Sequence, residues 1–300
     1  MGKRDVRPAL RLGIIGLGPW AGRYFSTCAG MTGHMEIVAA SRRSDAPAPD
    51  FAAGVPIFKN WEDMFDMRLD GLIVAAHPSS HASILELCAA RGMPVMLEKP
   101  MALDRDSLDR ISRIRSAAPV LINHIHLFSP TFEEIRSMIS QRDGDVRIIS
   151  CGAGPGPVRD YSSLWDYGPH DVSMCVGLLG PEASLSWSEC VASGDSRTYR
   201  MIIGSCGSEA DVTVSNGSPE KIRILRVEFD GHVAIYDDRS SVKFRLDGSP
   251  VPVSQDPPLT RSVMSFLSAI RDGVRDWRFG TGIGVTVCRL LSRVEDNPRT

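Results

Sequence analysis

Two stretches of this chain carry side chains that could move a proton and stabilise negative charge. The segment LWDYGPHD places His170 between Asp166 and Asp171, and the segment LEKPMALD places Lys99 before a proline. Histidine titrates near neutral pH, and a lysine ammonium can hydrogen-bond to an oxygen that gains charge. Each residue also has an ordinary structural alternative: a buried structural histidine, a helix cap at Asp166, or a surface ion pair between Lys99 and Glu98.

The spacing within LWDYGPHD favours a helix start. If a helix begins near Asp166, then Asp166 and His170 are four residues apart and point from one face of its first turn. Pro169 would be tolerated there, because first-turn N–H groups have no helical partner. We expect Asp171 to be a solvated or capping acid and not a catalytic group.

A glycine-rich turn near the N-terminus predicts a dinucleotide site. GIIGLGPWAG places Gly16, Gly18 and Ala21 in a G-x-G-x-x-A pattern after an expected strand and at the start of an expected helix. Gly16 permits the tight turn, Gly18 lets the backbone approach a pyrophosphate, and the helix N-terminus favours an anion. Pro19 and Trp20 complete the predicted loop, whose alternative is a turn with no ligand.

The end of the second expected strand indicates which cofactor is bound. An acid at this position would bind the ribose of NAD, but the sequence has Ser41, Arg42 and Arg43 instead. Guanidinium groups pair well with a 2′-phosphate, so the sequence favours NADP(H) over NAD(H). NAD(H) stays possible, because Asp45 could return to the ribose, and a solvated basic turn is the structural alternative.

The first 125 residues alternate strand and helix patterns. Apolar runs predict strands at 10–16, 35–41, 70–76, 93–98 and 118–124. Helices are expected near 20–31, 80–91 and 104–117. Continuous apolar runs are typical of strands buried on both faces, and alternation with helices gives a doubly wound parallel sheet. The predicted fold class is therefore α/β for this half.

The second half predicts an α+β domain. A helix near 130–141 leads to DVRIISCGAG, and strand-like segments follow at 183–191, 199–206, 209–215, 221–229, 231–237 and 241–246. Consecutive strands without intervening helices suggest an antiparallel sheet, with Asp230-Gly231 as a hairpin turn. Helices near 259–273 and 282–294 end the sequence. We divide the chain into 1–123, a dinucleotide-binding domain, and 124–300, a substrate-binding and oligomerisation domain.

Composition argues against several classes of protein. The formal net charge of −2 gives no basic field for nucleic acid, and no run of eighteen apolar residues predicts a membrane helix. The basic N-terminus is followed by an apolar run that is too short and glycine-broken for a signal peptide. Seven scattered cysteines without a CxxC pair read as free thiols of a reducing cytoplasm. We therefore expect a cytoplasmic protein with no membrane partner.

The order of these motifs resembles the Gfo/Idh/MocA family of NAD(P)-dependent oxidoreductases over nearly the whole chain. The resemblance rests on G-x-G-x-x-A, HPSSH, EKP, a later D-x-x-x-H and the closing helices PLTRSVMSFLSAIRDG and GTGIGVTVCRLL. It implies an N-terminal Rossmann domain and a C-terminal α+β domain with an open, mostly antiparallel sheet. It also implies a sugar, sugar-nucleotide or polyol substrate, and a homodimer or homotetramer formed through that sheet.

The resemblance assigns roles to particular residues. It implies catalytic roles for Lys99, His170 and Asp166. Cofactor contacts are expected from Gly16, Gly18, Pro19, Trp20, Ala21, Ser41, Arg42, Arg43, His77, Pro78, His81, Glu98 and Lys99. Substrate contacts are expected from His124, His126 and Trp165. No metal site is expected, because the family needs none and Pro78 interrupts the H-x-x-x-H spacing of His77 and His81.

The mechanism implied is reversible hydride transfer at a hydroxyl or ketone carbon. His170 would act as general acid and base with a pKa near working pH, and Lys99 would stabilise charge on the substrate oxygen. Asp166 would orient His170 or bind a neighbouring hydroxyl. Two alternatives stay open: a glycosidase that oxidises a sugar transiently with bound NAD, and a non-catalytic cofactor sensor.

Overall fold

The computed structural model of the protein describes residues 8–141, 144–156 and 160–296. These residues form two compact units that are interleaved along the chain. The first unit contains the described residues up to Glu98, with 109–123 and 262–281; the second contains 99–108, 124–261 and the described residues from Gly282. The domain boundary expected at residue 123 stays a prediction.

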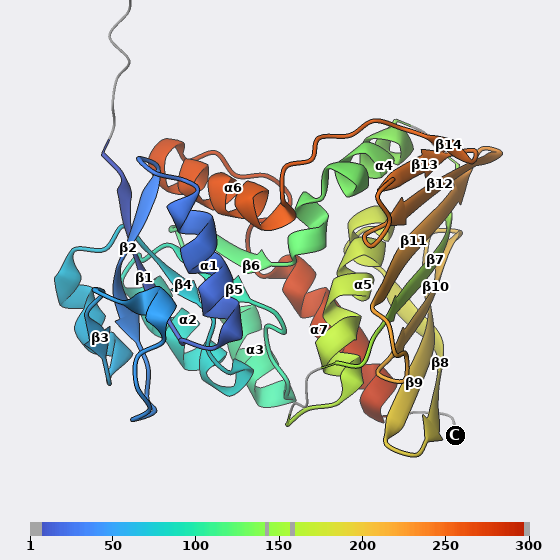
Figure 1. Cartoon of the computed structure of the whole chain (residues 1–300). Helices are drawn as coiled ribbons and strands as arrows, with labels where there is room; N and C mark the ends of the chain where they lie inside the picture. The colour runs from blue at the N-terminus through green and yellow to red at the C-terminus, as the bar shows by residue number, and fades with distance from the viewer. Residues whose placement is uncertain (1–7, 142–143, 157–159, 297–300) are drawn as a thin grey trace, which may run out of the picture. The chain divides into compact units, whose positions relative to one another are not determined.

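The sheet of the first unit has six parallel strands in the order β3-β2-β1-β4-β5-β6 (Figure 1). The strands are β1 (Leu10–Ile15), β2 (Met35–Ser41), β3 (Ile57–Phe58), β4 (Gly71–Val74), β5 (Val95–Glu98) and β6 (Val120–Asn123). Every residue of β4, β5 and β6 is buried, as continuous apolar runs require. The doubly wound parallel sheet is confirmed, and the two-residue β3 was too short to leave a pattern.

Helices and short 3₁₀ turns connect these strands. They are α1 (Pro19–Ala29), η1 (Asp50–Ala52), η2 (Trp61–Met67), η3 (Pro78–Ser80), α2 (His81–Ala90) and α3 (Arg105–Arg113). Helix α6 (Pro258–Asp272) comes much later in the chain and connects none of these strands. Part of α6 packs on the first sheet, because a Cβ at Gly71 of β4 would lie only 3.1 Å from Cδ1 of Ile270. The chain from 262 therefore returns to the first unit.

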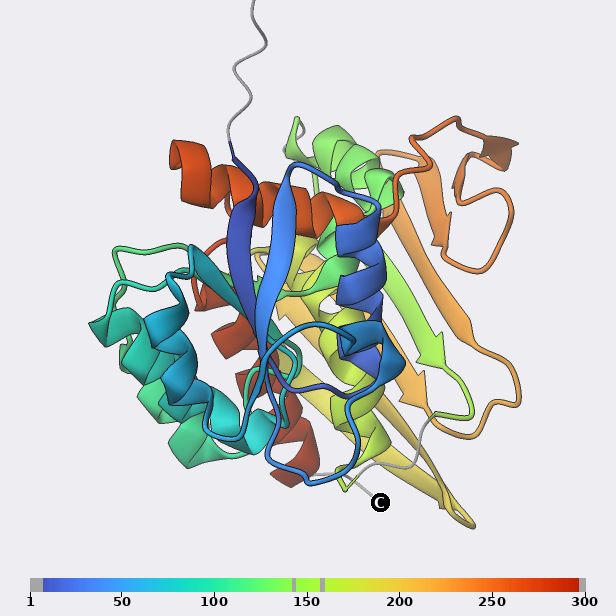
Figure 2. The ribbon, with the colours of Figure 1, turned by 60° about the vertical axis from the view of Figure 1, so that its left-hand side comes forward.

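The second unit contains an eight-stranded sheet in the order β14-β13-β12-β11-β7-β10-β9-β8. Its strands are β7 (Arg147–Ala153), β8 (Ser184–Ser193), β9 (Ser196–Ser205), β10 (Ser208–Ser215), β11 (Ile222–Phe229), β12 (His232–Asp237), β13 (Phe244–Leu246) and β14 (Ser249–Pro250). Only β7 and β10 pair in parallel, so the expected mostly antiparallel sheet is confirmed. Figure 2 shows β8 and β9 as a long hairpin, drawn in yellow.

The turn between β11 and β12 is the one expected from sequence. Asp230 and Gly231 both have positive φ, at 46° and 79°, and Phe229 pairs directly with His232. Positive φ at both central residues defines the type I′ turn that matches the twist of a hairpin.

One face of the large sheet carries the helices of the second unit. Figure 1 shows α4 (Pro130–Ser140), α5 (Ser163–Leu179) and α7 (Gly282–Asp296) on that face. On the other face Ile149 and Ile224 are 40% and 36% exposed, although apolar. No helix within the described ranges is long and apolar enough to cross a membrane.

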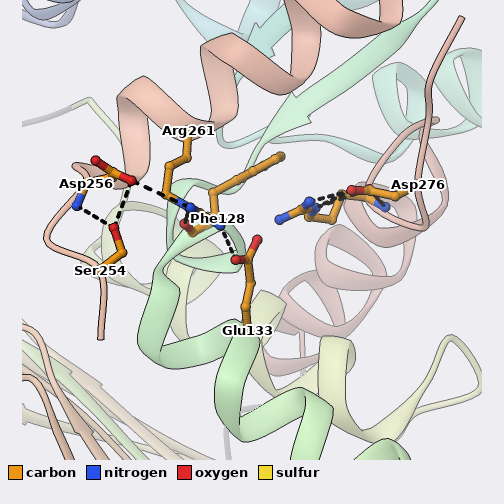
Figure 3. Close-up of polar contacts among 7 residues, drawn as sticks. Phe128, Glu133, Ser254, Asp256, Arg261 and Asp276 are labelled. Carbon is orange, nitrogen blue, oxygen red and sulfur yellow. Dashed lines mark hydrogen bonds and ion pairs between the residues drawn. The ribbon is translucent and has the colours of Figure 1, made fainter. Parts of the chain in front are cut away.

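A short 3₁₀ helix, η4 (Ile125–Phe128), contains His126 and has His124 as its N-cap residue, so it places two of the predicted site histidines near the large sheet. Arg261 fixes its end: its Nε donates to the main-chain oxygen of Phe128 at 3.0 Å, and its Nη2 pairs with Glu133 of α4 (Figure 3). A guanidinium can do both because its donors diverge in one plane. The position of η4 is thus fixed by a side chain more than a hundred residues later.

Candidate active site

Helix α5 carries LWDYGPHD and begins earlier than the sequence predicts. It starts at Ser163 with Ser162 as N-cap residue, so Pro169 is its seventh residue and lies in the second turn. The expected start near Asp166 is therefore wrong by three residues. Because Pro169 has no N–H, the carbonyl of Trp165 lacks its usual helical donor.

A glycine permits the close packing of α5 on each of two faces. A Cβ at Gly168 of α5 would lie 2.8 Å from Leu291 of α7, and a Cβ at Gly154, directly after β7, would lie 2.7 Å from the hydroxyl of Tyr167. Residues four apart share a helix face, so Asp171 follows Tyr167 towards β7. The remaining face presents Asp166 and His170.

Asp171 is fully buried, so the expectation of a solvated acid is wrong. Its Oδ2 accepts a hydrogen bond from Nη1 of Arg223 at 3.0 Å, and its Oδ1 accepts one from Ser150 at 2.9 Å. A Cβ at Gly152, which pairs with Arg223 across the sheet, would lie 2.1 Å from Oδ2. The carboxylate thus fits only because residue 152 is glycine. Burial raises the pKa of Asp171, and the Arg223 guanidinium opposes that shift.

The structure brings Lys99 and Asp166 together. Nζ of Lys99 donates to the main-chain oxygen of Asp166 at 2.8 Å and lies 3.5 Å from its Oδ1. Their side chains are 11% and 13% exposed, so each keeps a small accessible surface. The Lys99 ammonium group, directly after β5, thereby lies on the face of α5 that carries Asp166. His170 lies on the same face, four residues after Asp166.

His170 is a neutral imidazole in this environment. Burial lowers its pKa well below 6.5, and the nearby charges of Lys99 and Arg223 lower it further. A charged imidazole would lose its hydration and face two cations, so the neutral form is favoured. The expected pKa near working pH is therefore wrong for the ligand-free protein. Among the described residues, no hydrogen-bond partner reaches the buried Nδ1 of His170.

Two further histidines from the η4 region border this group. The ring of His126 meets the ring of His170 edge to face, with centroids 5.0 Å apart. His124 is 2% exposed, and both of its ring nitrogens are buried. Burial lowers its pKa to about 4, with Lys99 adding to the shift. The site thus combines neutral imidazoles with an ammonium group.

The glycine loop of the first unit fits a pyrophosphate. Gly16 has φ +94°, and its Cβ would lie 2.6 Å from the carbonyl oxygen of Ala75, so only glycine is accommodated. At Gly18 a Cβ would meet nothing within 4 Å among the described atoms, which leaves room above the N-terminus of α1. That helix has no side-chain cap and no acid in its first turn, so its N–H groups and dipole are available to an anion.

The strand end that should distinguish NADP from NAD is basic. Arg42 is half-buried and donates to the carbonyl of Pro47 at 2.6 Å, while Arg43 is exposed. The acid that could compete, Asp45, pairs with Lys59, and this hydrogen bond lowers the pKa of the carboxyl group. The carboxylate that could bind the ribose of NAD is therefore already paired with Lys59.

Several predicted cofactor residues have structural partners. His77 accepts the N–H of Ser79 and caps η3, and His81 is fully buried with its Nε2 3.1 Å from the carbonyl oxygen of Ala76. Glu98 is 5% exposed and accepts hydrogen bonds from Tyr24 at 2.6 Å and Asn123 at 2.8 Å. These bonds join α1, β5 and β6 directly before Lys99. The cofactor contacts expected of these residues stay predictions.

Trp165 is the last of the predicted substrate-binding residues. Trp165 is 2% exposed and its indole donates to Glu295 of α7 at 2.8 Å, so its side chain packs within the second unit. A substrate contact from it stays a prediction. Among the described residues, no group of three histidine, cysteine or acidic side chains is placed to hold a metal ion.

Comparison with known proteins agrees with this arrangement. Residues 10–124 match the Gfo/Idh/MocA oxidoreductase family, NAD-binding Rossmann fold. Inositol 2-dehydrogenase 2 of Saccharopolyspora erythraea is 24% identical over 185 residues, which are 58% of this chain and 55% of that relative. The chain spans about half the length of the curated relatives it matches.

Solved structures match almost the full length. A crystal structure from Magnetospirillum magnetotacticum, classed among the oxidoreductases, has 26% identity and a TM-score of 0.80 over 95% of this chain and 99% of that chain. UDP-N-acetylglucosamine 3-dehydrogenase GnnA of Acidithiobacillus ferrooxidans has the same fold, with 19% identity and a TM-score of 0.81 over 97% and 98% of the two chains. The family match thus covers the parallel sheet with its glycine loop, and the solved structures share the fold of this chain along nearly its whole length.

Proposed function

We propose that the protein is an NAD(P)-dependent oxidoreductase that interconverts a secondary hydroxyl and a ketone on a sugar, nucleotide sugar or related polyol. The observation that carries this proposal is the grouping of Lys99, Asp166 and neutral His170 in the second unit. The nicotinamide cofactor would supply the hydride chemistry, and the glycine loop of the first unit would hold its pyrophosphate.

In the oxidative direction the substrate loses a hydride from carbon and a proton from oxygen. His170 would take that proton, because its lowered pKa leaves the imidazole unprotonated and ready to accept it. Lys99 would donate a hydrogen bond to the same oxygen and stabilise the charge that develops as the proton leaves. Reduction reverses both steps.

Asp166 has a different role in this proposal from the one expected from sequence. Its main-chain oxygen and its carboxylate both lie next to the Lys99 ammonium, so Asp166 positions Lys99 and balances its charge. The Lys99 side chain is only 11% exposed, and a largely buried charge needs such partners, because burial without compensation is costly. This contact is the main structural support for assigning Asp166 to the site.

The polar site and the names of similar proteins both support a polyhydroxylated substrate. Inositol 2-dehydrogenase and UDP-N-acetylglucosamine 3-dehydrogenase act, by their names, on a cyclic polyol and a nucleotide sugar. We propose a polyhydroxylated ring of this kind for the present chain. The segment LWDYGPHDVSM resembles versions of this motif in family members associated with sugar-nucleotide metabolism, and this resemblance supports a nucleotide sugar.

A substrate panel tests the proposed function. Purified protein is incubated with inositols, aldoses and UDP-sugars and with NAD⁺ or NADP⁺, and the reduced nicotinamide is followed at its absorbance band. We expect one chemical class to turn over, with the ketone product identified by mass spectrometry. Turnover of none, or release of an aglycone without net cofactor reduction, would overturn it.

We further propose that NADP(H) is preferred over NAD(H). Arg42 and Arg43 follow β2, and Asp45 is engaged by Lys59. In an open parallel sheet, ligands bind beyond the carboxyl ends of the strands, where both arginines are located. Their guanidinium groups suit a 2′-phosphate, which is doubly charged and accepts bidentate hydrogen bonds.

Removing both arginines should weaken NADP(H) binding selectively. In the Arg42→Ala, Arg43→Ala variant we expect a loss of about 1.5–3 kcal/mol for NADPH, or roughly a tenfold to 150-fold higher Kd, with little change for NADH. Isothermal calorimetry with both cofactors measures this. Arg115→Ala is the control, because Arg115 is exposed and precedes β6 instead of following a strand. Equal losses for NADH and NADPH would contradict the assignment.

Self-association through the large sheet is also proposed. The face opposite α4, α5 and α7 exposes Ile149, Ile224 and Val191, the last 56% exposed. Strand register places all three on this one face. Apolar side chains gathered on an uncovered sheet face are typical of an interface, so we propose a homodimer or homotetramer.

A further inference from the structure

A chain of three side chains leads from the surface of the second unit to the histidine that lies against His170. Nδ1 of His126 lies 3.1 Å from the hydroxyl of Tyr236 on β12, and that hydroxyl lies 3.1 Å from Oδ1 of Asp238. Tyr236 is 1% exposed and His126 is 6% exposed, whereas the Asp238 side chain is 35% exposed. The polar chain therefore crosses from solvent into the interior.

The direction of these hydrogen bonds follows from counting protons. An ionised carboxylate only accepts, and a tyrosine hydroxyl has one proton to donate. Tyr236 must therefore donate to Asp238, and its oxygen must accept the proton of His126 Nδ1. The Lys243 ammonium group lies beside this carboxylate, since its Nζ is 3.8 Å from Oδ1 and donates to the main-chain oxygen of Asp238.

Burial keeps the His126 ring in its neutral form. It lowers the pKa of His126 well below 6.5, and the positive charges of Arg223, Lys99, Lys221 and Lys243 lower it further. The ring is therefore neutral, with one proton. Because Nδ1 carries that proton, Nε2 has a lone pair and can only accept.

We propose that Nε2 of His126 accepts a hydrogen bond from a substrate hydroxyl next to the reacting carbon, and that Tyr236 and Asp238 are positioning residues that fix this tautomer. The His126 ring contacts the His170 ring, so the acceptor lies beside the group that would take the reaction proton. This inference rests on the proposed function and narrows it to vicinal diols and α-hydroxyketones. An analogue without the neighbouring hydroxyl leaves the buried acceptor unpaired, which is costly.

The tautomer can be measured without any substrate. In ¹⁵N-labelled, ligand-free protein, long-range ¹H–¹⁵N spectra of the histidine rings distinguish the two neutral tautomers, and a His126→Gln variant assigns the signal. We expect the Nδ1-protonated form in the wild type and a shift towards the Nε2-protonated form in Tyr236→Phe. Asp238→Leu, which removes the acceptor at the more exposed end of the chain, should have the same effect. Tyr199→Phe, another buried tyrosine of this sheet, should leave the His126 signal unchanged. An Nε2-protonated ring in the wild type would overturn the proposal.

Kinetics test the role of the tautomer. The panel substrate that turns over, for instance myo-inositol, is compared with its analogue lacking one hydroxyl next to the reacting carbon. We expect the wild type to prefer the hydroxylated compound by roughly 100-fold or more in kcat/KM, and we expect Tyr236→Phe to reduce this preference through a lower kcat/KM for the hydroxylated compound. Turnover without such a preference overturns this inference and leaves the proposed function intact. If nothing turns over, the proposed function fails and the NMR result alone decides whether Tyr236 and Asp238 fix the tautomer.

Discussion

Replacing Lys99 or His170 with alanine is expected to lower the turnover number by about two orders of magnitude or more, the usual scale of a lost acid–base or charge-stabilising group. His170→Ala removes the proton acceptor, and Lys99→Ala removes the ammonium group that Asp166 holds at 2.8 Å. Steady-state kinetics with the substrate identified in the panel measure both variants. The control is His34→Ala, which removes an exposed histidine of the first unit.

The two variants should also differ in their pH dependence. Oxidation requires neutral His170, and the lowered pKa of this residue places the acidic limb of kcat/KM below pH 6.5 in the wild type. Because the Lys99 charge contributes to that lowering, Lys99→Ala should move the limb to higher pH. Unfolding midpoints near that of the wild type would show that the effects are not due to misfolding. Unchanged turnover in both alanine variants contradicts the assignment of the site.

The sequence predicts most of the regular elements because buried strands leave continuous apolar runs. β4, β5 and β6 are buried throughout, and the predicted bounds of all three lie within two residues of the observed ones. The two-residue strands β3 and β14 were missed, since two residues show no periodicity. Lys99 and the Asp166–His170 pair came from short motifs and not from a physical derivation of their contact. Their proximity depends on how the segment after β5 packs against α5, which local pattern does not determine.

The surroundings of these residues could be predicted less well. Asp171 looked like a surface acid because its partner, Arg223, lies 52 residues later on a strand. One signal was available: in β11, Arg223 alternates with the buried Leu225, Val227 and Phe229, which places the arginine on the inner face of the sheet. An arginine on an apolar face requires a buried acid. The lowered pKa of His170 was missed for a related reason, because it depends on burial and on charges from distant segments.

Replacing Asp171 with alanine should destabilise the protein by about 3–5 kcal/mol. Arg223 is 5% exposed, and the change would leave its charge buried without a partner, which costs more than the ion pair itself contributes. Urea denaturation followed by circular dichroism measures the free energy of unfolding. The matched control is Asp211→Ala, which breaks the more exposed ion pair with Arg200 on the same sheet and should cost about 1 kcal/mol or less.

A double variant separates the cost of the unpaired charge from the cost of lost packing. Asp171→Leu with Arg223→Met removes both charges and keeps apolar volume, so it should recover much of the stability that Asp171→Ala loses. Gly152 limits the recovery, because the space beside β7 is shaped for a carboxylate, and leucine replaces the two carboxylate oxygens with bulkier methyl groups. If Asp171→Ala and Asp211→Ala lower the free energy of unfolding equally, the buried ion pair does not anchor α5. The position of His170 would then depend on the other contacts of α5, such as the one between Gly168 and Leu291.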